Sequence, residues 1–178
     1  MRVSFQTAVS GWHDFYILAG TAAATLVGLL FVGLSLHLRV VIASSEVRSL
    51  ARVTLANFGA MLFVALFMVI PQDRSTAAVE LIASGLASLV ITAPSLVGAL
   101  QSQDRTLQMR PRDRARLLLR FGLSVASYLA ITVAGALLFS STQAFTWLVV
   151  ATVVLLLVSL RNTWDLLVTV GEVALGRD

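Results

Sequence analysis

The first apolar stretch of the chain, residues 15–38, reads FYILAGTAAATLVGLLFVGLSLHL and contains no Asp, Glu, Lys or Arg. A helix needs about 20 predominantly apolar residues to cross the roughly 30 Å hydrocarbon core of a bilayer. The hydrophobic part of a secretory signal peptide is shorter, at about 7–15 residues, and follows a basic segment. Only Arg2 precedes this stretch as a basic residue. The stretch therefore predicts an uncleaved transmembrane helix and, with it, a membrane fold.

Four further apolar runs have the length of a membrane span. They cover residues 53–70, 76–100, 117–139 and 144–160. Short connections at residues 71–75 and 140–143 require the flanking helices to pair as antiparallel hairpins. The sequence thus predicts an all-α polytopic transmembrane helix bundle with five spans, folded as a single domain over residues 1–178. Four spans are the alternative, if one run lies in the membrane interface.

The overall composition agrees with a membrane-embedded chain. Of the 178 residues, 58% are hydrophobic and 12% are charged, and the mean hydropathy is +0.90. A soluble domain is about 45–50% apolar and about 25% charged. The measured composition excludes an ordinary water-soluble domain, and its apolar content excludes a disordered chain.

The residue types that the chain lacks narrow its chemistry. The absence of Cys removes disulfides and thiolate metal sites, and the absence of Lys removes Schiff-base chemistry. The two His, His13 and His37, are predicted at opposite ends of the first span, too far apart to share a metal. Phosphate-binding, zinc-protease and serine-hydrolase motifs are missing from the sequence. We therefore expect no cofactor and no catalytic site, with a membrane enzyme as the least favoured class.

All 13 basic residues are Arg, and their placement predicts how the bundle is oriented. Cytoplasmic loops of membrane proteins carry an excess of basic residues. Arg2 and Arg74 fall on one side of the predicted spans. Eleven fall on the other side: Arg39, Arg48, Arg52, Arg105, Arg110, Arg112, Arg114, Arg116, Arg120, Arg161 and Arg177. We therefore expect an inner (plasma) membrane protein of bacteria with its N-terminus outside and its C-terminus in the cytoplasm. The formal charge of +4 then needs no nucleic-acid partner.

Aromatic residues and the C-terminal tail fit the same orientation. Trp12 and Trp147 fall at the predicted outer interface and Trp164 at the inner one, where Trp is enriched in membrane proteins. Residues 161–175 predict an amphipathic C-terminal helix that either continues the fifth span or lies on the inner leaflet. Its apolar face holds Leu160, Trp164, Leu167, Val168 and Gly171, and its polar face holds Arg161, Asp165 and Glu172.

A basic cluster lies in the connection between the third and fourth spans, residues 101–116. Basic residues near a membrane surface attract anionic lipid head groups by about 1 kcal/mol each. The cluster predicts contact with anionic lipid or with a cytoplasmic partner, and the alternative is that it only determines topology. It comprises Arg105, Arg110, Arg112, Arg114 and Arg116.

Polar residues recur every four positions in the third and fourth spans, which places them on one face of each helix. In hydrocarbon such groups are expected to face protein or water. They predict a polar seam between the two spans. The seam is either a conduction path or a contact in which hydroxyls bond to carbonyls of their own helix. It comprises Glu80, Ser84, Ser88, Thr92, Arg120, Ser124, Tyr128 and Thr132, with Asn57 from the second span.

Four residues of these spans carry an expectation of their own. Glu80 is predicted in the first turn of the third span, where the helix dipole favours an acid; the alternative is a cation or proton site. Arg120 is expected to reach the cytoplasmic interface. Asn57 is expected to fix the helix register through a polar partner. Pro94 predicts a kink in the third span, either static or hinge-like.

Small residues line one face of the first span at Gly20, Ala24 and Gly28. Such spacing lets the backbone of another helix approach closely. The pattern predicts either an interface of a homo-oligomer or packing within the same bundle.

The first span also carries a resemblance. The segment Gly20 to Gly33, GTAAATLVGLLFVG, preceded by Trp12-His13-Asp14-Phe15-Tyr16, resembles the opening of small multi-pass membrane proteins that recur uncharacterised in high-GC bacteria. The use of Arg without Lys is typical of a high-GC genome. The resemblance covers the first span alone and implies no activity and no site.

Two functions are compatible with these patterns. The first is an oligomeric interaction or regulatory subunit or scaffold, working as a homo-oligomer or within a membrane complex. The small-residue face of the first span and the Arg-rich connection motivate it. The alternative is a small ion channel or transporter that uses the polar seam between the third and fourth spans.

Overall fold

The computed structural model describes residues 5–101, 111–141, 144–174 and 176, and over that part of the chain it is helical without strands. The elements are α1 (Phe5–Leu36), α2 (Leu38–Ala43), α3 (Ser45–Val69), α4 (Arg74–Gln101), α5 (Pro111–Leu138) and α6 (Ala144–Ala174). Five of these helices, α1, α3, α4, α5 and α6, are long and apolar enough to cross a membrane. The predicted bundle of five spans is confirmed, and the chain is a multi-pass membrane protein.

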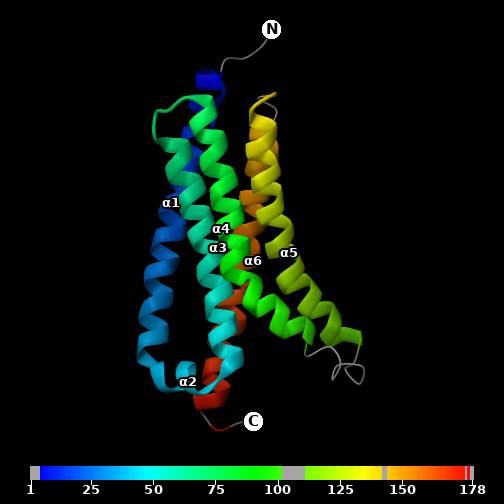
Figure 1. Cartoon of the computed structure of the whole chain (residues 1–178). Coiled ribbons are helices and arrows are strands. Elements are labelled where there is room, and N and C mark those ends of the chain that lie inside the picture. The colour runs from blue at the N-terminus through cyan, green and yellow to red at the C-terminus, as the bar shows by residue number, and fades with distance from the viewer. Residues whose placement is uncertain (1–4, 102–110, 142–143, 175, 177–178) are drawn as a thin grey trace.

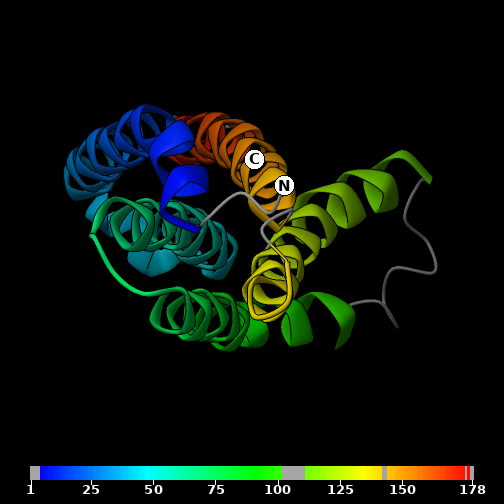
Figure 2. The same cartoon turned by 90° about the horizontal axis from the view of Figure 1, so that it is seen from above.

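The five long helices run side by side along one axis (Figure 1). The connection between α3 and α4 lies at the upper end of Figure 1, and α2 lies at the lower end. Helix α3 is the central element because it packs on α1, α4 and α6, while α5 packs on α4 and α6. Figure 2 shows α1, α3 and α4 along one side of the bundle and α5 and α6 along the other. Accordingly, α3 is the most buried span and α1 the least.

The helices extend beyond the predicted apolar runs. The segment predicted as a loop after the first span is mostly helical, since it forms α2 and the first turns of α3. Ser44 begins α3 because its side chain accepts a hydrogen bond from the backbone N–H of Val47 at 3.3 Å, as N-cap residues do. Arg48 and Arg52 therefore belong to α3 and are carried on a helix near the lower end.

The C-terminal tail continues the fifth span instead of forming a separate element. Helix α6 runs without a break for 31 residues. Asn162, Leu166 and Val170 are buried on its inner face, so the tail packs in the bundle along the same face as the span. Arg161 is exposed and Asp165 is half-buried. Residue 175, at the end of the predicted tail, lies outside the described residues.

Helices α4 and α5 approach closely because two glycines lie at their contact. A Cβ added to Gly85 of α4 would lie 2.8 Å from the backbone oxygen of Tyr128. A Cβ added to Gly135 of α5 would lie 2.9 Å from the backbone oxygen of Ala78. Both distances are too short for real side chains. Glycine at these positions brings the two helices into backbone contact, as small residues do in membrane bundles.

The upper end of the α4–α5 pair is fixed by two charged residues. Asp73 precedes α4 and its carboxylate accepts hydrogen bonds from the backbone N–H groups of Ser75 and Thr76, each at 3.1 Å. Arg74 donates from Nε to the backbone oxygen of Leu138, in the last turn of α5. An acid at a helix start and a cation at a helix end both complement the helix dipole.

Pro94 lies inside α4, seven positions before the helix ends at Gln101, and α4 bends toward its lower end (Figure 1). Proline removes a backbone donor and crowds the preceding turn, which bends a helix. The lower part of α4 and the beginning of α5 consequently lean away from the other helices (Figure 2).

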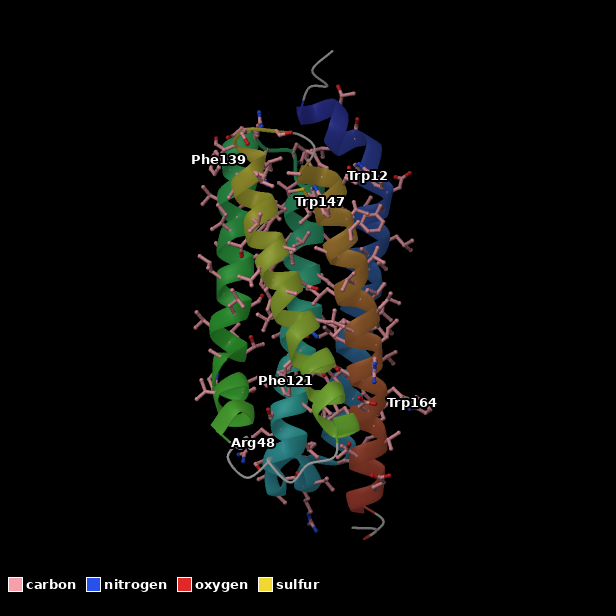
Figure 3. The ribbon with its side chains drawn as sticks, turned by 90° about the vertical axis from the view of Figure 1, so that its right-hand side faces the viewer. Trp12, Arg48, Phe121, Phe139, Trp147 and Trp164 are labelled. Atoms are coloured by element: carbon pink, nitrogen blue, oxygen red, sulfur yellow. The ribbon has the colours of Figure 1, made fainter. Side chains whose placement is uncertain are left out.

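The outer surface of the bundle is apolar, and tryptophan residues lie near its upper and lower ends. Leu18 and Val90 are examples of large apolar residues that are more than two-thirds exposed. Figure 3 shows Trp12 and Trp147 near the upper end and Trp164 near the lower end. Trp147 and Trp164 are separated by 17 positions on α6, or about 25 Å at about 1.5 Å per residue. This spacing matches the roughly 30 Å hydrocarbon core of a bilayer.

Candidate functional site

The structure buries most of the predicted polar seam between α4 and α5. Thr132 and Glu80 are half-buried, and the side chain of Arg120 lies outside the described residues. The buried members are Ser84, Ser88 and Thr92 on α4, Ser124 and Tyr128 on α5, and Asn57 on α3. The seam residues of the described chain are therefore brought together, and Asn57 joins them from a third helix.

Asn57 connects α3 to α5 through both ends of its amide. Its Nδ2 donates a hydrogen bond to the hydroxyl oxygen of Ser124 at 3.1 Å. Its Oδ1 accepts a hydrogen bond from the hydroxyl of Tyr128 at 2.5 Å. Asn57 and Tyr128 are both 0% exposed. A fully buried amide with two side-chain partners fixes the relative position of the two helices, because sliding either one would leave polar groups unpaired.

Three other seam hydroxyls, those of Ser88, Thr92 and Thr132, bond within their own helices. Ser88 donates to the backbone oxygen of Ser84 at 2.8 Å, and Thr92 donates to that of Ser88 at 2.8 Å. On α5, Thr132 donates to the backbone oxygen of Tyr128 at 2.9 Å. This is the local bonding that polar residues adopt inside membrane helices. Together with the close approach at Gly85 and Gly135, it makes the seam a packed contact.

A second feature, which sequence reasoning missed, is an open groove between α3 and α4. Its volume is about 440 Å³. We call it the α3–α4 groove. The α3 wall consists of Arg52, Leu55, Ala56, Gly59, Ala60, Phe63 and Phe67, and the α4 wall consists of Glu80, Ala83, Ser84, Ala87, Ser88 and Ile91.

Both walls of the groove follow the spacing of a helix–helix seam. The lining positions recur at intervals of three and four residues on each helix, which is the pattern of a face that packs against another helix. Small side chains predominate in the middle of the groove. A Cβ added to Gly59 would meet no atom within 4 Å, so the floor of the groove has room there. The signal in the sequence was the recurrence of small residues at helical spacing, Ala56, Gly59 and Ala60 on α3 and Ala83 and Ala87 on α4. The groove that they line depends on how the two helices pack.

The groove carries polar atoms that have no partner. The Oε2 atom of Glu80 and the Oγ atom of Ser84 are both buried without a hydrogen bond. Ser84 is only 7% exposed, and both residues line the groove. An unsatisfied polar group in hydrocarbon is destabilising, because lipid tails have no group that can hydrogen-bond to it.

The predicted position of Glu80 in the helix is wrong. Helix α4 begins at Arg74, so Glu80 lies in the second turn and not in the first. The helix starts earlier than its apolar run because Asp73 caps it with hydrogen bonds to Ser75 and Thr76. The favourable dipole effect is confined to the first turn. The acid at the helix start is Asp73, and the dipole does not explain Glu80.

The small-residue face of α1 divides between the bundle and the surface. Gly20 packs on α3, where an added Cβ would lie 2.9 Å from the Cβ of Ala65. Ala24 and Gly28 are exposed, and a Cβ added to Gly28 would meet no atom within 4 Å. One part of the predicted pattern thus serves packing within the bundle, and the rest faces outward.

The predicted basic cluster lies largely outside the described part of the chain. Arg105 and Arg110 are not among the described residues. Arg112, Arg114 and Arg116 lie in the first turns of α5, and their side chains are also outside the description. Among the described residues, His, Asp and Glu form no group that could hold a metal ion.

No family model, curated protein or solved structure matches this chain. The function is therefore argued from the geometry of the seam and the groove.

Proposed function

We propose that the protein is an interaction subunit of a membrane complex and that it binds a transmembrane helix of its partner in the α3–α4 groove. The observation that supports this most directly is the combination of an open, helix-spaced groove with the unpartnered polar atoms of Glu80 and Ser84. A bare lipid tail offers no hydrogen-bond donor to either atom. A helix with a polar side chain does.

The shape of the groove also suits a helix. From Phe67 to Arg52 the α3 wall covers 15 positions, or about 22 Å of helix at about 1.5 Å per residue. This is about three-quarters of the roughly 30 Å hydrocarbon core. Association of helices in lipid depends on close packing, since the hydrophobic effect does not drive it. The Ala and Gly residues on the two walls allow such packing.

A conduction path along the α4–α5 seam receives less support. Water would have to separate α4 from α5, but Gly85 and Gly135 hold their backbones in contact. Three of the hydroxyls that would line the path, those of Ser88, Thr92 and Thr132, are bonded to their own helices, and those of Ser124 and Tyr128 bond to Asn57. We therefore place the function in the groove and assign no transport or catalytic step to the seam. A homo-oligomer through the exposed Ala24 and Gly28 of α1 is the other arrangement compatible with an interaction subunit.

A filled groove provides the test of helix binding. Gly59→Leu places a large side chain in the groove without a clash at the backbone, because the site has open space. Gly28→Leu is the matched control on α1, where the surroundings are equally open. The variants are extracted from their native membrane in a mild detergent, and the protein mass of each particle is measured by light scattering.

We expect the wild type and Gly28→Leu to elute in a complex larger than one chain, and Gly59→Leu to elute as a single chain. If all three proteins have the same mass, the groove does not hold the complex together. A smaller particle for Gly28→Leu alone would move the interface to α1.

The proposed setting is the inner membrane of a bacterium, with the N-terminus outside, the C-terminus in the cytoplasm and the Arg-rich side against anionic lipid. The uneven distribution of Arg supports it. Because the chain has no Cys, single Cys variants report topology cleanly. We expect an impermeant thiol reagent to label Ser75→Cys in intact cells and Ser45→Cys only after the membrane is opened. The reverse pattern would invert the orientation.

A further inference from the structure

Glu80 gives the α3–α4 groove a specific chemical preference. Among the described residues that line the groove it is the one acid, and its Oε2 atom is buried without a hydrogen-bond partner. The lining residues next to it on α4, Ala83 and Ser84, are uncharged, and so are the lining residues of α3 apart from Arg52. A carboxylate inside a membrane is costly unless a cation or several donors accompany it.

The basic residues of the groove and of the α4 start do not supply that cation. Arg74 precedes Glu80 by six positions on α4, but its Nε donates to the backbone oxygen of Leu138 on α5, and its buried Nη2 makes no hydrogen bond to Glu80 or to any other group of the described residues. Arg52 lines the opposite end of the groove. On the α4 wall, Ile91 marks that end and lies 11 positions from Glu80, or about 16 Å along the helix at about 1.5 Å per residue.

A second copy of this chain would not bring a cation to the right depth either. Helix α1 contains no Arg or Lys from Phe5 to Leu36. The stretches Phe121–Leu138 of α5 and Ala144–Leu160 of α6 contain none. In a second copy Arg74 makes the same bond to Leu138, and Arg48 and Arg52 belong to the lower end of α3. We therefore look for the partner of Glu80 in a different chain.

We propose that the groove binds a transmembrane helix of another protein that carries one Arg or Lys opposite Glu80. This inference rests on the proposed function and names the chemistry of the partner. The basic side chain donates to the Glu80 carboxylate, and the rest of the helix packs on the Ala and Gly residues of the two walls. Charge-assisted hydrogen bonds are stronger than neutral ones, so the pair selects the partner by its charge, while the small residues provide the contact area.

Synthetic helices test the proposal with the full-length protein in phosphatidylcholine nanodiscs. The first peptide is a Leu–Ala transmembrane helix with a single Lys about six positions from the end that lies beside the α3–α4 connection. The second has Gln in place of that Lys, and the third has the Lys at the same depth from the opposite end. Binding is measured by energy transfer between a labelled peptide and a labelled protein.

We expect the first peptide to bind at least about tenfold more tightly than the other two, since a charged pair is worth more than a neutral hydrogen bond. Glu80→Gln should abolish this preference and leave the weaker binding of the Gln peptide unchanged. Gly59→Leu should abolish binding of all three peptides, and Gly28→Leu should change none. Thermal unfolding of each variant confirms that it is folded before binding is compared.

The outcomes separate the inference from the proposed function. Equal binding of the Lys and Gln peptides to the wild type would overturn the inference while leaving a helix-binding groove. No binding of any peptide would remove both. If phosphatidylethanolamine displaces the Lys peptide from the wild type, and Glu80→Gln discs show no such lipid effect, the cation in the groove is a lipid ammonium and the proposed partner helix is wrong.

Discussion

The hydroxyl of Tyr128 on α5 donates to the side-chain oxygen of Asn57 on α3, across 71 positions of sequence. The other end of the same amide donates to Ser124, one turn before Tyr128 on α5. All three side chains are buried. This small network is a side-chain link between the central helix and α5, and none of its three residues lines the α3–α4 groove. We therefore expect stability and partner binding to depend on different residues of α3.

Removing the amide should weaken the fold more than removing the phenol hydroxyl. In Asn57→Leu the buried hydroxyl of Tyr128 loses its acceptor, and an unsatisfied buried group costs about 1–3 kcal/mol. In Asn57→Leu, Ser124 loses its bond to the amide as well. In Tyr128→Phe only Oδ1 of Asn57 is left without a partner, while its Nδ2 keeps Ser124, so we expect a smaller loss, of about 1 kcal/mol. The free energy of unfolding in mixed detergent and SDS measures both. Equal stability of Asn57→Leu and wild type would rule out this role.

Replacing Asn162 with Leu should change the free energy of unfolding in the opposite direction to Asn57→Leu. It is 1% exposed on α6, yet neither its Nδ2 nor its Oδ1 has a hydrogen-bond partner. Replacing such a group with an apolar side chain of similar size removes its desolvation cost. We expect Asn162→Leu to raise the free energy of unfolding by about 1 kcal/mol. The Asn57→Leu variant is the matched comparison, and a loss of stability in both would show that Asn162 has a partner in the membrane.

The glycine at the α4–α5 contact should tolerate no side chain. Gly85→Ala places a Cβ 2.8 Å from the backbone oxygen of Tyr128, which forces the helices apart. Overpacking of this kind costs about 1–3 kcal/mol. Gly59→Ala, with open space at its Cβ, is the control and should leave the unfolding free energy within about 0.5 kcal/mol of the wild type. Similar losses for the two variants would mean that the contact at Gly85 is not tight.

The cap of α4 should depend on pH. Hydrogen bonds from the hydroxyl of Ser75 and from Thr76 hold the pKa of Asp73 well below its usual range. A lowered pKa in the folded state stabilises the protein fully above the ordinary Asp value of about 3.9, and this stabilisation is lost as the pH falls through the folded pKa. Asp73→Ala should therefore melt below the wild type at pH 7, with a difference that shrinks below about pH 4. A constant difference down to pH 2 would contradict the hydrogen-bonded cap.

The number of helices and the helix face of each polar residue could be predicted from the sequence, because both depend on local properties of the chain. Five apolar runs predict five helices because backbone groups in hydrocarbon must bond within their own segment. Polar residues spaced by four, such as Ser84 and Ser88, share a helix face whatever the rest of the chain does. The ends of helices were predicted less well. Asp73 and Ser44 extend α4 and α3 beyond their apolar runs through hydrogen bonds that hydropathy does not register.

The sequence could not predict which helix faces pack against each other. The spacing of Glu80, Ser84 and Ser88 placed them in the seam with α5. In the structure all three also line the groove beside α3. Which neighbour a residue faces depends on the rotation of each helix about its axis. That rotation is set by contacts between distant segments, such as Gly85 against Tyr128 and Asn57 against Ser124.

The sequence by itself determined that the chain crosses the membrane five times, because the length and apolarity of each span are local properties. Tertiary structure alone decided which polar groups are satisfied. It paired Asn57 with two partners and left Glu80 with an unpaired oxygen in an open groove. Lipid drives helix formation without dictating which helix faces meet. The assembly of the bundle, through close packing and a few buried hydrogen bonds, therefore creates the site.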